Sequence, residues 1–263
     1  MNILVCVTRV PDTAENEIEV NADGTDIERD DLVYSVNEWD NYAVEEAIQL
    51  REVHGGNITV VTVGGGDDEE VLRREMAMGA DNGLLLSDDA FEGSDGRGVA
   101  AILKMAVEKG SYDLILTGAQ SQGGAGEVGG MLAAMLDRPY ASLVNSIEKK
   151  SDATLTIGRE IEGGNSEMSE IDLPCVLSIQ TGINEPRYVG IRGIRKVASV
   201  DIPVHGASDL GVDAARVGAA GAKVKHVDYF VPELGEGAEM LDGSTDEIIE
   251  RLVEMLKARG GLK

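Results

Sequence analysis

Short apolar runs alternate with helical segments through the first half of the chain. β-Branched and other apolar residues fill positions 3–7, 58–63, 84–86 and 114–117. Apolar residues recur at helical spacing over about residues 38–53, 69–78, 95–109 and 127–136. This alternation predicts right-handed βαβ units and a parallel sheet. Because the strands are apolar at nearly every position, we expect helices to cover both faces of the sheet.

The pattern changes near residue 140, where strands follow one another without helices between them. Residues 141–148, 153–162, 166–171 and 175–180 predict strands joined by short polar turns. Residues 184–232 show neither helical nor strand periodicity, which favours an arm that lies on a partner. The chain closes with the capping box Ser244-x-x-Glu247 and an amphipathic helix that needs a surface to dock on.

The expected fold class is therefore α/β. We predict a doubly wound, mostly parallel, Rossmann-like sheet with an added antiparallel region and an extended C-terminal arm and helix. The strand order 3-2-1-4 would place the first and fourth strands side by side. We expect an α/β domain over residues 1–183 and the arm with its helix over residues 184–263.

Residues 124–129 read GAGEVG, which matches the dinucleotide fingerprint G-x-G-x-x-G. That fingerprint belongs directly after the first strand of a Rossmann unit, but here it follows the fourth, which disfavours a redox dinucleotide. The absence of a following Gly-Lys-Ser/Thr excludes a P-loop. Backbone N–H groups at the start of the next helix still favour a phosphate. We predict a phosphate-binding loop; the alternative is a flexible connection.

The net charge of −25 limits the kinds of partner that we expect for this protein. A protein this acidic repels nucleic acid and anionic lipid surfaces. The acidic residues are dispersed and lysines are few, as in halophilic proteins from salt-filled cytoplasms. The start of the chain lacks the basic region and cleavage site of a signal peptide, and the cysteines, Cys6 and Cys175, lie in apolar strands. These features predict a cytoplasmic protein with reduced thiols.

Catalytic chemistry is scarce in the sequence. The three histidines are far apart, no C-x-x-C occurs, and no G-x-S-x-G elbow appears. We therefore expect no metal site and no catalytic residues, which means a protein that is not itself an enzyme.

Several segments resemble one known family. Residues 159–164 read REIEGG, residues 173–176 read LPCV, and residues 184–188 read NEPRY. Together with VTRVPD near the start, AMGAD at residues 77–81 and DLGVD at residues 209–213, they resemble the electron transfer flavoprotein β subunit family over nearly the whole chain. The resemblance implies a heterodimer with an α subunit that carries a redox-active FAD, while this chain holds AMP as a structural, adenine-nucleotide ligand. It also implies electron transport from acyl-CoA dehydrogenases of fatty acid oxidation, or similar flavoenzymes, to a membrane quinone reductase.

The resemblance also assigns site residues by position. The AMP pocket would comprise Cys6, Asn37, Glu38, Trp39, Asp40, Val63, Gly118, Gln120, Gly123, Gly124, Ala125, Gly126, Glu127 and Val128. Arg159 and Glu160 would lie near the flavin domain of the α subunit; the alternative is a solvated cross-strand pair. Ile191 would anchor partner dehydrogenases beside Arg192, in a recognition loop; the alternative is a core isoleucine.

One departure from the family pattern keeps alternatives open. The loop is shorter by about one residue, and Glu127 stands where the family has a glutamine. A carboxylate weakens phosphate binding unless its backbone N–H faces the anion. Bifurcating relatives place a second FAD in this region, so a bifurcating-type subunit is an alternative, although the loop lacks their acidic-Thr-Ala-Gln-Val pattern. Two rivals of another class are an adenine-nucleotide-hydrolysing enzyme of the same fold and a self-associating regulatory protein.

Overall fold

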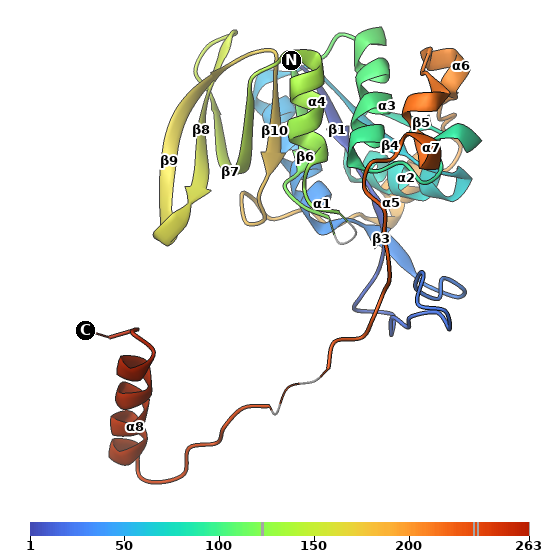
Figure 1. Cartoon of the computed structure of the whole chain (residues 1–263). Helices are drawn as coiled ribbons and strands as arrows, with labels where there is room; N and C mark the ends of the chain where they lie inside the picture. The colour runs from blue at the N-terminus through green and yellow to red at the C-terminus, as the bar shows by residue number, and fades with distance from the viewer. Residues whose placement is uncertain (122–123, 234, 236, 263) are drawn as a thin grey trace. The chain divides into compact units, whose positions relative to one another are not determined.

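The apolar runs of the first half form the parallel part of a large sheet (Figure 1). The computed structural model describes residues 1–121, 124–233, 235 and 237–262. Within these residues the sheet has nine strands in the order β11-β5-β4-β1-β6-β10-β7-β8-β9. Its first-half strands are β1 (Asn2–Cys6), β4 (Asn57–Val63), β5 (Asn82–Leu86) and β6 (Leu114–Gly118). β4 and β6 flank β1, and β5 lies beyond β4, which confirms the predicted order 3-2-1-4.

The strands after residue 140 extend this sheet on the β6 side. β7 (Tyr140–Lys149), β8 (Thr154–Ile161) and β9 (Asn165–Asp172) form the predicted antiparallel region. β10 (Cys175–Ile179) instead lies between β6 and β7 and is parallel to both. The periodicity of the sequence does not predict this position of β10 between β6 and β7. The composition of β10 is consistent with it, because all five residues are buried, as in a central strand.

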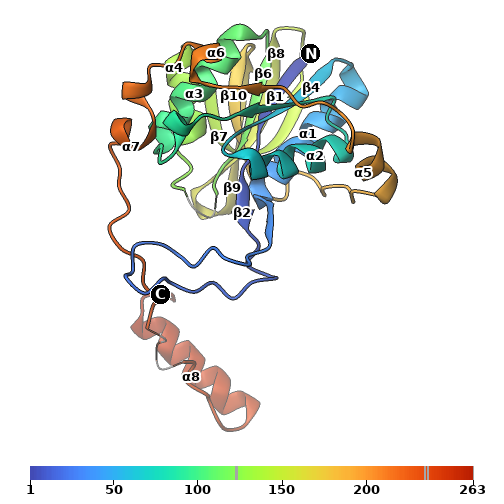
Figure 2. The ribbon, with the colours of Figure 1, turned by 90° about the vertical axis from the view of Figure 1, so that its right-hand side faces the viewer.

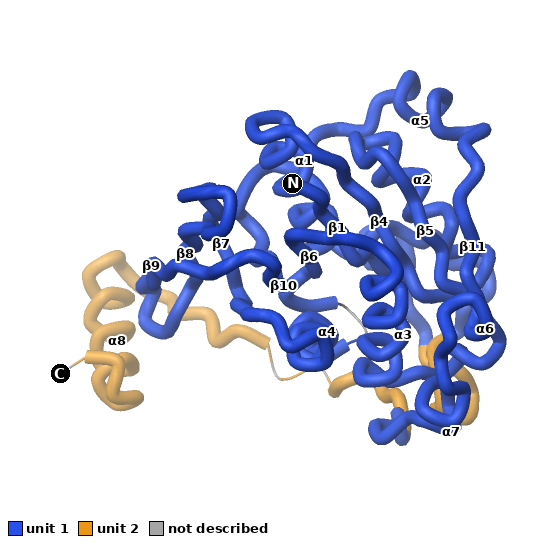
Figure 3. Tube along the Cα trace, turned by 90° about the horizontal axis from the view of Figure 1, so that it is seen from above, with its two compact units in different colours: residues 1–19, 28–227 blue, residues 20–27, 228–263 orange. Residues whose placement is uncertain are grey.

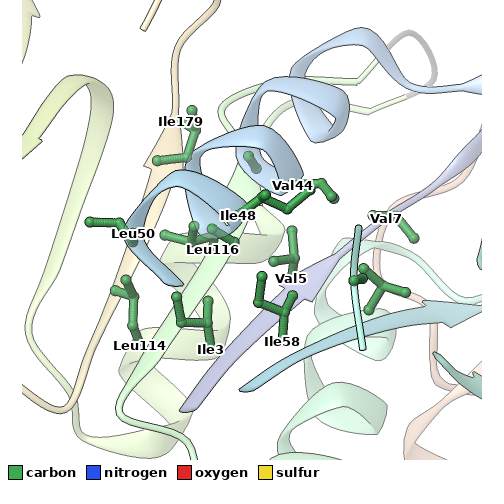
Figure 4. Close-up of a cluster of buried hydrophobic side chains, with 14 of the residues drawn as sticks. Ile3, Val5, Val7, Val44, Ile48, Leu50, Ile58, Leu114, Leu116 and Ile179 are labelled. Carbon is green, nitrogen blue, oxygen red and sulfur yellow. The ribbon is translucent and has the colours of Figure 1, made fainter. Parts of the chain in front are cut away.

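Two helical layers cover the sheet (Figure 2). They are built mainly from α1 (Glu38–His54), α2 (Glu69–Met78), α3 (Gly96–Lys109) and α4 (Val128–Leu136), close to the predicted bounds. Alternate strand residues face opposite layers. Ile3 and Val5 pack in the cluster that contains α1 and α2, whereas Leu4 packs in the cluster that contains α3 and α4. Figure 4 shows Val44 and Ile48 of α1 over this first cluster. Burial on both faces explains the continuous apolar strands.

Residues 184–227 contain short elements that sequence periodicity did not predict. They are α5 (Ile191–Val197), β11 (Val204–His205), α6 (Ala207–Leu210) and α7 (Gly218–Gly221). Each is too short to show a helical or strand period. Residues 184–227 are held on the sheet domain by buried side chains such as Ile202, Leu210 and Val217. β11 also pairs with β5 at the edge of the sheet. These residues are therefore folded onto the sheet domain rather than extended throughout.

The chain divides into two compact units (Figure 3). The first comprises residues 1–19 and 28–227 and includes a small antiparallel pair, β2 (Arg9–Pro11) with β3 (Tyr34–Val36). The second comprises residues 20–27 and 228–263, and in it the Tyr229 N–H donates to the Gly24 carbonyl (2.7 Å). The functional division predicted at residues 183/184 stays a prediction.

α8 (Thr245–Ala258) is the principal element of the second unit. It begins at the predicted capping box, where the Glu247 N–H donates to Ser244 Oγ and the Ser244 N–H donates to Glu247 Oε2. Its apolar face is half-exposed at Ile249, Leu252 and Leu256. Among the described residues, no helix is both long enough and apolar enough to cross a membrane.

Candidate functional site

The carboxyl ends of β1 and β6 meet the start of α1. Asn37 is fully buried at the N-cap position of α1, but its side chain does not cap the helix. Its Nδ2 instead donates to the Gln120 carbonyl (2.9 Å), 83 residues away along the chain. Asn37 Oδ1 is buried without a hydrogen-bond partner in the described part of the chain. Asn37 therefore ties the start of α1 to the loop after β6.

Asp40 joins the ends of the two strands. Its Oδ2 accepts the Thr8 N–H (2.9 Å) and its Oδ1 accepts the Gly118 N–H (3.0 Å). Burial raises the pKa of Asp40 to about 7, although the hydrogen bonds from Asn37, Gly118 and Thr8 act in the opposite direction. Both carboxylate oxygens accept hydrogen bonds from backbone N–H groups, so Asp40 connects the segment after β1 and the end of β6 to the start of α1.

The glycines of the loop have different roles. Gly126 has φ +70°, and a Cβ there would clash with the Ala119 carbonyl. A Cβ on Gly129 would clash with Ser178 Oγ and lie 2.7 Å from Thr117 Oγ1, so this glycine lets α4 pack closely on β6 and β10. Gly124 and Ala125 are exposed, and Gly123 lies outside the described residues. We call Asn37, Asp40, Gly118 and residues 124–128 the loop cradle.

Glu127, the least expected member of the loop, has its side chain against another helix. A Cβ on Gly96 would clash with Glu127 Oε1 and would lie 2.6 Å from its Cγ. Gly96 is the first residue of α3, where the helix dipole favours a negative charge. The carboxylate therefore has a favourable position of its own beside α3. Val128, the first residue of α4, is half-buried.

The remaining predicted pocket residues lie on the same edge of the sheet. Cys6 and Val63 end neighbouring strands, β1 and β4, and both are half-buried. Burial, with a smaller contribution from the negative charge of Asp40, raises the pKa of the Cys6 thiol far above its ordinary value. This shift favours the protonated thiol over the thiolate. Trp39 is half-buried and Glu38 is exposed in the first turn of α1.

Arg159 and Glu160 lie on β8, away from this edge. Arg159 pairs in register with Glu167 of β9, and Nη1 lies 3.6 Å from its Oε2, so the cross-strand alternative is present in the structure. Glu160 has another partner, because its Oε2 accepts a hydrogen bond from Gln180 Nε2 (3.1 Å). The two residues help to line a hollow of about 530 Å³ with Leu143, whose φ of +56° is unusual for a leucine.

Ile191 is a surface residue, with 68 % of it exposed, so the core alternative is wrong. It is the first residue of α5, and Arg192 beside it is exposed. α5 packs on α2, where a Cβ on Gly193 would clash with the Ala77 carbonyl. The structure therefore separates Ile191 and Arg192 from the β8 pair by several strands of the sheet (Figure 1).

The sequence did not reveal the residue that holds the NEPRY segment. Arg187 Nε and Nη2 donate to the two oxygens of Glu45 (2.8 and 2.9 Å), and Nη1 donates to Glu52 Oε1 (2.8 Å). Asn184 Nδ2 donates to the Tyr42 carbonyl and to Glu46 Oε2. These bonds pin residues 184–187 on α1 immediately before the exposed Tyr188. The run of glutamates in α1 indicated an interaction, but the spacing of residues along the chain did not identify Arg187 as the partner.

Glu75 is a buried acid without a partner. It is fully buried in α2, and neither oxygen has a hydrogen bond in the described part of the chain. Burial raises the pKa of Glu75 to about 8, while Arg74 lowers it and Asp40 raises it further. Because the folded-state pKa is the higher one, the stabilisation that this shift provides is complete below the unfolded-state pKa and is lost as pH rises through 8.

The variant Glu75→Met should therefore flatten the pH dependence of stability. Between about pH 5 and pH 8, the free energy of unfolding of the unmodified chain should fall by about 2–4 kcal/mol more than that of the variant. Denaturant titrations across this range measure the difference, with the exposed Glu92→Gln as a control that keeps the original slope. Parallel slopes for Glu75→Met and the unmodified chain would contradict the prediction.

A doubly wound, mostly parallel sheet with a glycine-containing segment between β6 and α4 defines a Rossmann-like α/β protein. A family model described as the electron transfer flavoprotein domain matches residues 25–210. The β subunit of the electron transfer flavoprotein of Methylophilus methylotrophus is 36 % identical over 97 % of this chain and 98 % of its own length. That of Thermoanaerobacterium thermosaccharolyticum is 36 % identical over 98 % and 99 %. Subunit CarD of the caffeyl-CoA reductase–Etf complex of Acetobacterium woodii is 33 % identical over 98 % and 99 %.

The chain belongs to the electron transfer flavoprotein family, and several relatives matched over nearly their whole length are named as its β subunit. Family membership implies a role in electron transfer, an association with flavin and an α subunit as partner.

Proposed function

We propose that this chain binds AMP in the loop cradle as a structural ligand. The supporting observation is that Asn37 and Asp40 attach the start of α1 to the end of β6 and to the loop that precedes α4. Backbone N–H groups in the first turn of α4 and the dipole of this helix would bind the phosphate. No lysine or arginine occurs between residues 114 and 137, so this segment itself supplies no side-chain cation for a triphosphate. This composition favours a monophosphate and argues against nucleotide hydrolysis.

The redox centre in this proposal is the FAD of the α subunit. Glu160 and Arg159 would face its flavin domain across the hollow on β8, and α8 would pack its half-exposed apolar face on the α subunit. Electrons would come from an acyl-CoA dehydrogenase or a similar flavin dehydrogenase and go to a quinone reductase. We place the carrier in the cytoplasm and attribute its acidic surface to a salt-rich medium.

A bifurcating subunit is the second candidate. The name of CarD describes a relative that works in a complex with a reductase. In that reading the loop cradle would hold the pyrophosphate of a second FAD. The two candidates differ in what the cradle contains, and both keep this chain as an electron-transfer subunit.

Carrier function is tested by reconstituting the full chain with its α subunit. Addition of an acyl-CoA dehydrogenase and its substrate should bleach the flavin absorbance of the heterodimer and leave this chain alone unchanged. Hydrolysis of ATP by this chain alone would contradict the carrier proposal. A flavin that stays oxidised beside several reduced dehydrogenases would contradict it as well.

Ile191→Ala should weaken docking of the dehydrogenase. Loss of one exposed apolar anchor costs about 1–2 kcal/mol, equivalent to a five- to thirtyfold lower kcat/KM for electron transfer. The positive charges of Arg192 and Arg195 should make the rate fall with added salt in both proteins. Val53→Ala, which truncates an equally exposed side chain on α1, is the matched control. Equal rates for Ile191→Ala and the control would remove Ile191 from the docking surface.

A further inference from the structure

Gln180 links two regions that are far apart along the chain. It is the residue after β10, and its side-chain amide is used at both ends. The indole Nε1 of Trp39 donates to Gln180 Oε1 (3.2 Å), and Gln180 Nε2 donates to Glu160 Oε2 (3.1 Å). The Thr181 N–H also donates to Oε1 (3.2 Å). The backbone N–H of Gln180 donates to the Val144 carbonyl (2.9 Å), which fixes the residue between β10 and β7.

One end of this connection, Trp39, lies next to the loop cradle. Trp39 stands between Asn37 and Asp40 in the first turn of α1. The Cβ of Trp39 lies close to Gly118: a Cβ added to Gly118 would lie 2.7 Å from it. A ligand that moves the end of β6 or the start of α1 must therefore also move the indole.

The other end lies at the hollow on β8. Glu160 lines it, and its carboxylate is exposed apart from the bond to Gln180. An exposed glutamate on a strand has many rotamers, so a single hydrogen bond strongly restricts where its charge lies. Gln180 is thus the only side chain in the described part of the chain that hydrogen-bonds to both Trp39 and Glu160.

We propose that Gln180 is a positioning residue that couples the loop cradle to Glu160. The inference rests on the proposed function, because it takes AMP as the ligand of the cradle and the α subunit as the partner at β8. AMP in the cradle fixes Trp39, Trp39 fixes the Gln180 amide, and the amide holds the Glu160 carboxylate in the position that the partner meets. Because coupling between two binding sites is reciprocal, the α subunit must strengthen AMP binding by the same factor.

The coupling is measured as the ratio of two affinities. The Kd of AMP is determined for the full chain alone and for the full chain saturated with the α subunit. We expect binding of AMP to be about five- to twentyfold tighter in the heterodimer. In Gln180→Leu, which keeps the size of the side chain but has no polar atoms, the ratio should fall to about one while the Kd of AMP for the chain alone changes less than about twofold.

Two further variants make the test specific. Trp39→Phe keeps an aromatic ring without the N–H and should also remove the coupling. The double variant should lose no more than either single one, since both break the same connection. Gln49→Leu is the matched control, because Gln49 also donates to a glutamate, Glu45, but does not touch the loop cradle. Trp39 is the sole tryptophan of the chain, so its fluorescence should shift in Gln180→Leu and not in Gln49→Leu.

The outcomes separate the inference from the function on which it rests. A ratio in Gln180→Leu equal to that of the unmodified chain would overturn the inference and leave the AMP proposal standing. Coupling that survives in Trp39→Phe would overturn it in the same way. Absence of AMP binding to the unmodified chain and to its heterodimer would overturn the AMP proposal and the inference together.

Discussion

Arg187→Ala should lower the free energy of unfolding by about 2–4 kcal/mol. The guanidinium binds both oxygens of Glu45, and only 4 % of the Glu45 side chain is exposed, so its removal leaves a nearly buried carboxylate unpaired. The expected loss is below that of a fully buried pair because 36 % of the Arg187 side chain is exposed. The variant should also impair docking of the dehydrogenase, since the segment that leads to Ile191 is no longer pinned to α1.

The same ion pair predicts an acid limb of stability. Burial raises the pKa of Glu45, but its bonds from Arg187 and Gln49 outweigh burial and hold the pKa below its ordinary value. A lowered folded-state pKa means that the stabilisation is present above the unfolded-state pKa and is lost as pH falls through the folded one. Denaturant titrations of Arg187→Ala should therefore show a weaker loss of stability in acid. Arg192→Ala, at an exposed position, is the control that keeps both stability and acid limb; a similar stability for both variants would contradict the account.

Gly118→Ala should weaken AMP binding about five- to 150-fold. A Cβ at this position would clash with Asp40 Oδ1 and lie 2.7 Å from the Cβ of Trp39. The backbone of α1 cannot retreat without breaking the bonds from Thr8 and Gly118 to Asp40. Overpacking of this kind costs about 1–3 kcal/mol, equivalent to an affinity about five- to 150-fold lower if the cost falls on the bound state.

Calorimetric titration with AMP measures this effect. Gly66→Ala is the matched control, because a Cβ there would have no heavy atom within 4 Å. Both variants reduce backbone freedom by the same glycine-to-alanine change. The difference between their AMP affinities therefore measures the effect of the clash between the new Cβ at residue 118 and Asp40. An affinity of Gly118→Ala within twofold of that of Gly66→Ala would show that the end of β6 does not shape the nucleotide site.

Local patterns predicted the elements that are long enough to show a period. The helix at residues 69–78 has the predicted bounds, and the order of the first four long strands follows from the handedness of βαβ units. The return of β10 between β6 and β7 was not predictable, because pairing of strands that are distant in sequence depends on tertiary packing. The elements within residues 184–227 were missed because two to seven residues are too few for periodicity.

The site was predictable in composition but not in its connections. Asn37 occupies the expected N-cap position, yet its Oδ1 accepts no hydrogen bond from the described residues, and its Nδ2 donates to the Gln120 carbonyl. The partners of Gln180 and Arg187 could not be predicted from the sequence, since they are 20 to 142 residues away. Cys6, Val63 and Gly118 do lie along one edge of the sheet, as carboxyl ends of neighbouring parallel strands must, and hydrogen bonds attach Asn37 and Asp40 to that edge.

The content of the loop cradle is the most direct test of the central claim. The full chain is purified with its α subunit without added nucleotide, the complex is denatured, and the released cofactors are quantified. The account predicts one AMP and one FAD per heterodimer. Two FADs and no AMP would contradict it and assign the cradle to a second flavin.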